Sequence, residues 1–308
     1  MKFPVALYFL SCQNINLTRV TISDSSGTGL AVYATGGQNH FQDCTLTNNG
    51  SPDNNTYPSG GGMYIEFPFC SPYHPGECKS DKARISNDFV TTSARYIITK
   101  CEFKGNTAHM WHPINYQYLL PQPTNHLSFG SGGGLSVIFS RANDSVATVT
   151  ECLFQNNKAE WGGGAAIEFQ GMSWNNTFVM ESCRFLNNTV PTEPSTAKVR
   201  GGGGLKLTFT SDFDDLMMAH NNMSFNNCTF RNNTGYWGGG ILLRAVREQQ
   251  RAKPTNTIEF YNCSWIENVG RVGSAMDIAV WGPALVGASL TPRFTDCTFR
   301  GNNDIFNF

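Results

Sequence analysis

The chain has 308 residues, and its formal net charge is −1 because 22 Lys and Arg nearly balance 23 Asp and Glu. Without a basic excess, the sequence does not favour binding to nucleic acid or to an anionic membrane surface. Charged residues make up 15%, too few for a solvated helical protein, and hydrophobic residues make up 40%, too many for a disordered one. The sequence contains no run of 18 apolar residues, so it predicts no membrane-spanning helix. The composition favours a β-rich protein with many glycine turns.

Residues 3–10 form the first apolar stretch, in which Val5, Leu7 and Phe9 alternate with other residues. Alternation with period 2 predicts a strand with one buried face. The same stretch could form the apolar core of a secretory signal peptide, but no small-residue cleavage site follows it. We therefore expect a strand here.

A nine-residue motif then recurs, with an apolar residue, a cysteine, a phenylalanine and an asparagine at positions 1, 4, 6 and 9. The copies begin and end at Phe41 and Asn49, Ile98 and Asn106, Val149 and Asn157, Met180 and Asn188, Phe225 and Asn233, Phe260 and Asn268, and Phe294 and Asn302. A degenerate copy contains Leu17, Val20 and Ile22. We expect the apolar, Cys and Phe positions to point inward and each Asn to form a turn whose amide bonds the next copy.

A glycine run followed by alternating apolar residues comes between successive copies. The clearest runs are residues 60–62, 132–134, 162–164, 202–204 and 238–240, and weaker ones begin at Gly27 and Gly273. The glycines predict a sharp corner, and the alternation after them predicts a further strand. Each repeat unit therefore contains short strands joined at corners.

Successive motif cysteines are 31 to 57 residues apart, which predicts one coil of a solenoid per copy. A β-propeller is the main alternative, but its blades need about 40–50 residues each. We expect an all-β, right-handed parallel β-helix of about seven to eight coils that forms a single domain over residues 1–308. Both ends fall within the repeat and show no cap, so we expect the chain to be a segment of a longer protein.

The pairing of F-x-x-N with G-G-[AILV] resembles the repeats of chlamydial polymorphic outer-membrane proteins. It is also similar to β-helix regions of large, uncharacterised animal cell-surface proteins. The matching positions include Phe103 and Asn106, Phe154 and Asn157, and Phe185 and Asn188, together with the glycine runs. The resemblance implies a right-handed β-helix and a surface-exposed, adhesive role. The chain lacks the C-terminal outer-membrane barrel of the bacterial family, and its sequons favour the animal-type relatives.

Seven of the ten cysteines belong to the motif and are expected to form one inward column. Stacked neighbours about 4.8 Å apart suit packing as small hydrophobic residues better than disulfide geometry, although some cross-coil bridges remain an alternative. Cys70 and Cys78 lie outside the motif, in a segment bent by Pro72, Pro75 and Gly76. We predict a local disulfide between them.

Ten Asn-x-Ser/Thr sequons occur in the chain. Some of them, such as those at Asn227 and Asn262, arise from the repeat motif itself. The sequons at Asn54, Asn143, Asn175 and Asn222 lie outside the motif, and we predict that these carry N-glycans. They favour an extracellular or cell-surface location.

Insertions lengthen the coils at two corners. They occupy residues 50–59, 107–131 and 189–200 before the glycine runs, and residues 68–95, 211–222 and 246–255 after the strands that follow those runs. Residues 107–131 are rich in aromatic side chains, and with residues 50–59 we predict a patch that binds a carbohydrate or protein ligand. Its candidate contacts are His109, Trp111, His112, Tyr116 and Tyr118. These aromatic side chains could instead pack on the flank of the solenoid. We expect no metal or other cofactor, because no Cys or acidic residue accompanies the histidines at ligand spacing.

Glu66 and Glu168 are the best catalytic candidates, because equivalent outward positions two coils apart place them roughly 9.6 Å from each other. This separation touches the upper end of the range for inverting glycosidases. Ile138 lies between them, and charged residues on a solvated strand are the simpler interpretation. We therefore expect a non-enzymatic extracellular structural or adhesive segment with a recognition surface on its loops. The alternative is a carbohydrate-active enzyme, a polysaccharide lyase or glycoside hydrolase, that acts on the sheet face.

Overall fold

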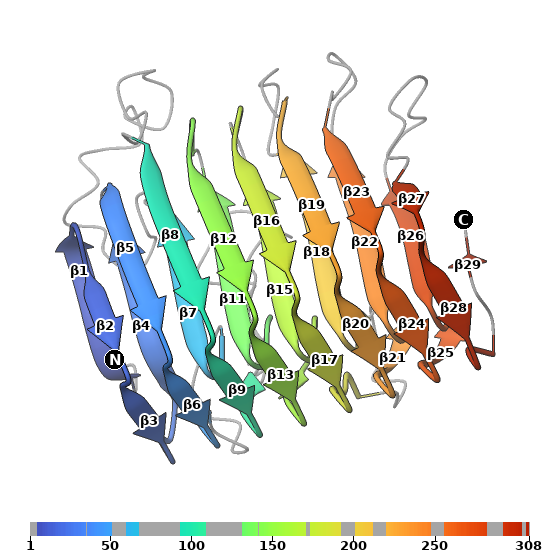
Figure 1. Ribbon diagram of the computed structural model, residues 1–308, viewed down its shortest axis with the longest axis horizontal. Coiled ribbons are helices and arrows are strands. Elements are labelled where there is room, and N and C mark those ends of the chain that lie inside the picture. The colour runs from blue at the N-terminus through green and yellow to red at the C-terminus, as the bar shows by residue number, and fades with distance from the viewer. Residues whose placement is uncertain are drawn as a thin grey trace, which may run out of the picture.

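The computed structural model describes residues 5–34, 36–50, 60–67, 93–108, 131–140, 142–170, 173–191, 201–211, 220–247, 256–281, 292–303 and 306–307. These residues form strands and turns, and they contain no helix. The strands stack in parallel along one long axis (Figure 1). They build three long sheets, which we call sheets A, B and C, and two small two-stranded ladders.

Sheet A has nine strands, and sheets B and C have eight each. Sheet A contains β1 (Val5–Cys12), β4 (Thr28–Ala34), β7 (Met63–Phe67), β11 (Leu135–Ser140), β15 (Ala165–Gln170), β18 (Leu205–Ser211), β22 (Ile241–Arg247), β26 (Met276–Trp281) and β29 (Phe306–Asn307). Sheet B contains β2 (Asn16–Thr18), β5 (Gly37–Gln42), β8 (Ala94–Thr99), β12 (Val146–Thr150), β16 (Thr177–Glu181), β19 (Asn222–Asn226), β23 (Thr257–Tyr261) and β27 (Arg293–Thr295). Sheet C contains β3 (Thr21–Ser23), β6 (Thr45–Thr47), β9 (Glu102–Lys104), β13 (Leu153–Gln155), β17 (Arg184–Leu186), β20 (Thr229–Arg231), β24 (Ser264–Ile266) and β28 (Thr298–Arg300). The small ladders pair β10 (Thr107–Ala108) with β14 (Lys158–Ala159), and β21 (Thr234–Trp237) with β25 (Val269–Val272).

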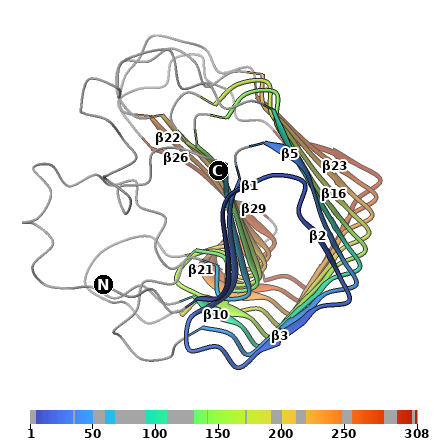
Figure 2. The same ribbon diagram turned by 90° about the vertical axis from the view of Figure 1, so that its left-hand side faces the viewer.

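The chain visits the sheets in the order A, B, C and then returns to sheet A one strand further along. Eight such coils form a right-handed parallel β-helix, and the three sheets enclose one core (Figure 2). The predicted fold class is confirmed. The first apolar stretch is strand β1, which pairs with β4, so its prediction as a strand is confirmed as well.

The core consists of columns in which one residue type repeats from coil to coil. Parallel register aligns Phe103, Phe154, Phe185 and Phe230, and their adjacent rings stack with centroids 4.5 to 4.8 Å apart. The motif cysteines from Cys44 to Cys263 form a second buried column, while Cys297 and Phe299 in the last copy are partly buried. The predicted inward columns are thus confirmed.

One motif copy spans two sheets rather than one strand. Phe41 lies in β5, Leu46 lies in β6, and Cys44 occupies the corner between them. The residue before the cysteine has a positive φ in each copy: Asp43, Lys100, Glu151, Ser182, Asn227, Asn262 and Asp296. This left-handed residue turns the chain from sheet B into sheet C. Each motif copy therefore contributes one short strand to sheet B and one to sheet C.

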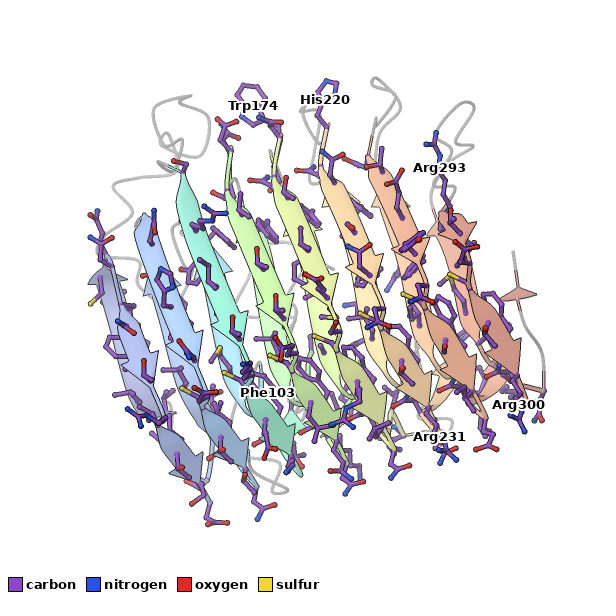
Figure 3. All side chains as sticks on the ribbon, in the orientation of Figure 1. Phe103, Trp174, His220, Arg231, Arg293 and Arg300 are labelled. Carbon is purple, nitrogen blue, oxygen red and sulfur yellow. The ribbon has the colours of Figure 1, made fainter. Side chains whose placement is uncertain are left out.

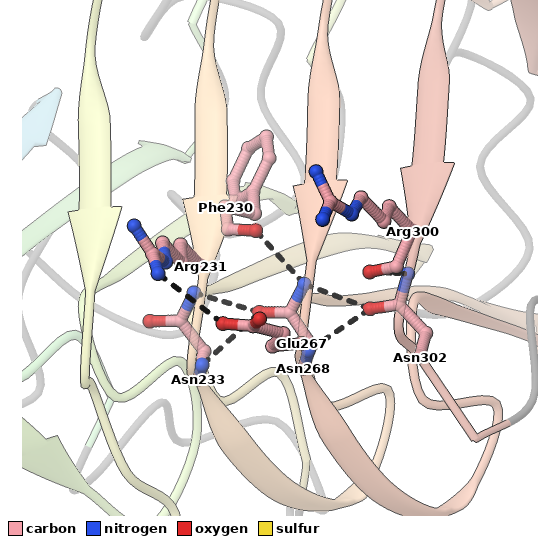
Figure 4. A network of polar contacts seen from close by, with 7 residues as sticks. All are labelled: Phe230, Arg231, Asn233, Glu267, Asn268, Arg300 and Asn302. Carbon is pink, nitrogen blue, oxygen red and sulfur yellow. Dashed lines mark hydrogen bonds and ion pairs between the residues drawn. The ribbon is translucent and has the colours of Figure 1, made fainter.

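The final asparagine of each motif forms a buried ladder that runs along the axis. In Figure 4, Asn233 donates from its backbone N and its Nδ2 to Oδ1 of Asn268, each at 3.0 Å. Asn268 bonds Asn302 in the same way and also donates from Nδ2 to the carbonyl of Phe230 at 2.8 Å. This confirms the predicted ladder. The positive φ belongs to the preceding residue, such as Asn232, and not to the ladder asparagine.

A second asparagine ladder lies at the corner before sheet B, where the sequence analysis did not predict one. Ser145 donates from its backbone N to Oδ1 of Asn176, which donates in turn to Asn221, and Asn221 donates to Asn256. Both ladders satisfy backbone groups that the tight corners would otherwise leave buried without partners. Two of the three corners are therefore fixed by stacked amides.

The aromatic column predicts a large loss on truncation. Phe185 is fully buried between the rings of Phe154 and Phe230. Phe185→Ala should lower the free energy of unfolding by about 3–5 kcal/mol, because it removes transfer energy and leaves a cavity. Urea denaturation followed by far-UV circular dichroism measures the loss. The exposed neighbour Arg184 provides the control, since Arg184→Ala should change stability by about 0.5 kcal/mol or less. A loss below about 1 kcal/mol for Phe185→Ala would contradict this packing.

The ladder predicts a comparable loss at Asn188. Its Nδ2 donates to the carbonyl of Phe154 and to Oδ1 of Asn233, and its Oδ1 accepts from the backbone N and the Nδ2 of Asn157. Asn188→Ala leaves these groups buried without partners, at about 1–3 kcal/mol each, so a total loss of about 3 kcal/mol or more is expected. The exposed neighbour Asn187 has φ +55° and tolerates glycine, so Asn187→Gly should be nearly neutral. Equal losses in the two variants would show that the ladder amides contribute nothing specific.

Candidate functional site

The predicted loop patch falls on His109, Trp111, His112, Tyr116 and Tyr118, all of which lie outside the described residues, as do residues 51–59. The structure nevertheless shows where these segments leave the coil. Along the chain, residues 51–59 and 109–130 each lie between a strand of sheet C and a strand of sheet A, and residues 68–92 lie between a strand of sheet A and a strand of sheet B. The insertions therefore begin at the edges of sheet A, as the spacing of the motifs predicts.

The outer face of sheet A carries two files of outward side chains. One file includes Glu66, Ile138, Glu168, Thr208 and Arg244, which parallel register places in successive strands. The predicted alignment of Glu66 and Glu168 two coils apart, with Ile138 between them, is confirmed. Lys206 belongs to the other file, two residues before Thr208 on β18.

Glu168 and Lys206 form a buried ion pair, with Nζ 3.0 Å from Oε1. Glu168 is 2% exposed and Lys206 is 6% exposed. The expectation of charged residues on a solvated strand is therefore wrong for these two. The reason is that the outer face of sheet A is itself buried here: Ser136, Ala166 and Leu242 in the file of Lys206 are all 0% exposed.

Two cations share the ring of Trp161. The Lys206 ammonium lies 4.9 Å from the ring centroid, and the Arg244 guanidinium lies 5.5 Å from it. Burial lowers the pKa of Lys206, whereas Glu168 opposes this effect and Arg244 adds to it. Burial also lowers the pKa of Arg244, against the attraction of Glu168. Trp161 and Glu168 thus hold two neighbouring cations together in a poorly hydrated place.

Two hydroxyl groups beside this cluster, Ser136 Oγ and Thr208 Oγ1, are buried without a hydrogen-bond partner. Ser136 lies two strands from Lys206 in one file, and Thr208 lies between Glu168 and Arg244 in the other. Buried polar groups normally have a partner, because an unmade hydrogen bond costs about 1–3 kcal/mol. The cluster therefore retains hydrogen-bonding capacity that the described residues do not use.

Three tyrosines lie on the outer face of sheet A in the first three coils, a feature that the sequence analysis missed. The ring centroids of Tyr8 and Tyr33 are 5.4 Å apart, and those of Tyr33 and Tyr64 are 5.5 Å apart. Tyr8 is 41% exposed, so the stack opens towards solvent at this end. Residues alternate between the two faces along β4 and β7, and this alternation places Tyr33 and Tyr64 on the outer face. The stack could therefore have been predicted once the register between coils was known.

Glu66 lies next to Tyr64, at the end of the stack that is farther from Tyr8, and its side chain is partly buried. Tyr64 donates from its hydroxyl to Oε2 of Glu66 at 2.7 Å. Burial raises the pKa of Glu66 from 4.5 to about 7, and the bond from Tyr64 offsets part of the rise. The two candidate carboxyl groups therefore differ: Glu168 has a cationic partner, and Glu66 has a phenol and a raised pKa.

The described cysteines are all free, and six of the eight are fully buried. Burial raises the pKa of the Cys183 thiol, and the neighbouring Cys152 and Cys228 raise it further. This supports packing over cross-coil bridges in the column. Cys70 and Cys78 lie outside the described residues. Within the part of the chain that is described, no cluster of three or more His, Cys, Asp or Glu side chains is arranged to hold a metal ion, and no helix is long and apolar enough to cross a membrane.

The buried ion pair predicts an asymmetric response to mutation. Lys206→Met leaves Glu168 buried without this counter-charge, so stability should fall by about 3–5 kcal/mol. The double variant Glu168→Gln/Lys206→Met should recover much of that loss. Lys104 and Glu102 form an ion pair of 2.6 Å on the surface, and Lys104→Met as a control should cost about 1 kcal/mol or less. Denaturant unfolding of the four proteins measures these differences, and equal losses for the two lysines would contradict the buried pair.

Glu66 predicts a specific pH dependence of stability. Its pKa is about 7 in the folded protein and 4.5 when unperturbed, so the folded state holds the proton more tightly. The stabilisation from this proton is fully present below pH 4.5, and it is lost as the pH rises to about 7. Glu66→Gln removes this dependence. Its stability relative to the native chain should therefore rise between pH 4.5 and 7, as followed by thermal unfolding at a series of pH values. A difference that stays constant over this range would refute the raised pKa.

No protein-family model, no curated protein and no solved structure matches this chain. The functional interpretation therefore depends on the geometry of the coils, on the insertions at the edges of sheet A and on the side chains of its outer face.

Proposed function

We propose that the chain is a non-enzymatic, extracellular structural or adhesive β-helix segment that binds a carbohydrate or protein ligand on the sheet A side. One observation carries the proposal. Two residues join sheet B to sheet C in all eight coils, for example Asp43 and Cys44, whereas the segments at both edges of sheet A vary widely in length. Variation confined to two edges of a rigid scaffold is typical of a recognition surface.

The scaffold suits this role because it orders the bases of the inserted segments before a ligand arrives. Stacked phenylalanines and two asparagine ladders fix the spacing between coils. Little conformational entropy is then lost from the scaffold on binding. The partly exposed tyrosine stack on the same side adds aromatic surface of the kind that contacts sugars and protein anchors.

Replacement of residues 109–129 with a short Gly-Ser turn tests the proposal. Thr107 and Ala108 should keep their pairing with Lys158 and Ala159, so the coil should fold as before. We expect the variant to lose binding to an array of immobilised glycans and to cultured animal cells, while its circular dichroism and unfolding midpoint stay unchanged. Replacement of residues 212–219, which join β18 of sheet A to β19 of sheet B along the chain, controls for a general effect of shortening an insertion.

A carbohydrate-active enzyme is the second candidate, and the contrast between Glu66 and Glu168 favours it. A carboxyl group with a pKa of about 7 suits a general acid, and a carboxylate paired with Lys206 suits a group that stays ionised. Ile138 separates the two, which weighs against a shared substrate position. The test is whether the chain releases reducing or unsaturated sugars from a panel of polysaccharides. If it does, and if Glu66→Gln and Glu168→Gln each abolish the release, the enzyme proposal replaces the binding proposal. Binding that survives the loop replacement but is lost in the double Gln variant would also favour this candidate.

A further inference from the structure

We propose that the outer face of sheet A binds one chloride ion beside Thr208 and the charged heads of Lys206 and Arg244. The proposal does not depend on the function proposed above. It concerns the cluster in which Glu168 and Lys206 form a buried ion pair while Lys206 and Arg244 share the ring of Trp161. Strands β15, β18 and β22 supply the charged groups and the hydroxyl, so the anion would join three neighbouring coils.

The cluster carries one positive charge in excess. Among the described residues, Glu168 and Arg244 are the charges that shift the pKa of Lys206, and Glu168 is the charge that shifts the pKa of Arg244. Two cations therefore face one carboxylate. The buried Glu160 and Asp277 are not among these charges, and each has an interaction of its own. An uncompensated charge in a poorly hydrated place is costly, and one bound anion would neutralise it.

Surface arginines show why the excess charge matters at this place. Figure 3 shows Arg231 and Arg293 at the periphery of the coils, where each pairs with a glutamate of a neighbouring coil. These side chains are more than half exposed, so water and dissolved ions screen their charges. The ion pair of Glu168 and Lys206 is buried instead. Screening is much weaker there, so a counter-ion has to bind at a fixed place.

The hydroxyl of Thr208 is the group that points to a ligand. Thr208 is 4% exposed, and its Oγ1 has no hydrogen-bond partner in the described part of the chain. Parallel register places Thr208 between Glu168 and Arg244, and Lys206 lies two residues before it on the same strand. Its O–H can therefore donate to an anion that also accepts from Lys206 and Arg244. The guanidinium of Arg244 has five N–H donors, so it keeps its other contacts when one of them binds the anion.

Charge and burial together define the occupant. One excess positive charge calls for one negative charge, as a halide provides. The occupant has to be small, because Glu168, Lys206 and Thr208 are all at most 6% exposed. The ammonium of Lys206 and the guanidinium of Arg244 suit an anion, since charge-assisted hydrogen bonds are about twice as strong as neutral ones. Chloride meets these requirements.

Thermal unfolding at constant ionic strength, with chloride replaced stepwise by the bulkier gluconate, tests the site. We expect the midpoint of the native chain to rise with the chloride concentration. Thr208→Val keeps the shape of the side chain but removes the hydroxyl, so it should weaken chloride binding about tenfold or more. Arg244→Gln removes the excess charge and should abolish the chloride dependence. Thr148→Val, which changes a partly exposed threonine of sheet B in the same way, is the matched control and should leave the dependence unchanged.

Crystals grown with bromide in place of chloride locate the ion, because bromide scatters anomalously. We expect an anomalous peak within hydrogen-bond distance of Thr208 Oγ1 that is absent from Arg244→Gln. The proposal is overturned by a midpoint that does not respond to chloride, or by a response that either variant retains in full. It is also overturned if water or a carboxylate of the chain itself occupies this position without a bromide peak. Peaks confined to exposed side chains such as Arg231 would have the same meaning, because they indicate an adventitious ion only.

Discussion

The structure depends on one constraint, which is the constant parallel register between neighbouring coils. Parallel pairing aligns each strand residue with the equivalent residue one coil away, so each position repeats along the axis. A residue type that packs well against itself is therefore favoured at every inward position. Phenylalanine stacks on phenylalanine, and the amide of asparagine both donates to and accepts from another asparagine. The core columns and the ladders follow from this single rule.

The same register explains how far the fold could be predicted from the sequence. Positions that face their own copies must keep their chemistry, so Cys152, Phe154 and Asn157 recur as a recognisable motif. The glycine runs recur because backbone atoms of the adjacent coil leave no space for a side chain. A Cβ on Gly163, for example, would lie 2.4 Å from the carbonyl oxygen of Gly203. Coil number, inward residues and corner positions were therefore predictable.

Features outside the columns were harder to predict, for physical reasons. The left-handed corner before each cysteine is occupied by Asp, Lys, Glu, Ser or Asn, because its side chain faces solvent and only its backbone is constrained. Alternation shows that Glu168 and Lys206 point outward, but it cannot show that this outer face is buried. The tyrosine stack depends on residues from different coils whose alignment only the register supplies. The candidate site was thus less visible in the sequence than the scaffold.

The direction of the hydrogen bonds has a mechanical consequence. Backbone bonds and asparagine ladders run along the axis, so each coil is held mainly by the two coils beside it. Tension along the axis loads one layer of bonds between two coils at a time, and the layers yield in sequence rather than together. Tension across the axis instead meets covalent backbone within every strand. The β-helix is therefore stiff in cross-section and extensible in steps of one coil, a property suited to a protein element that transmits force.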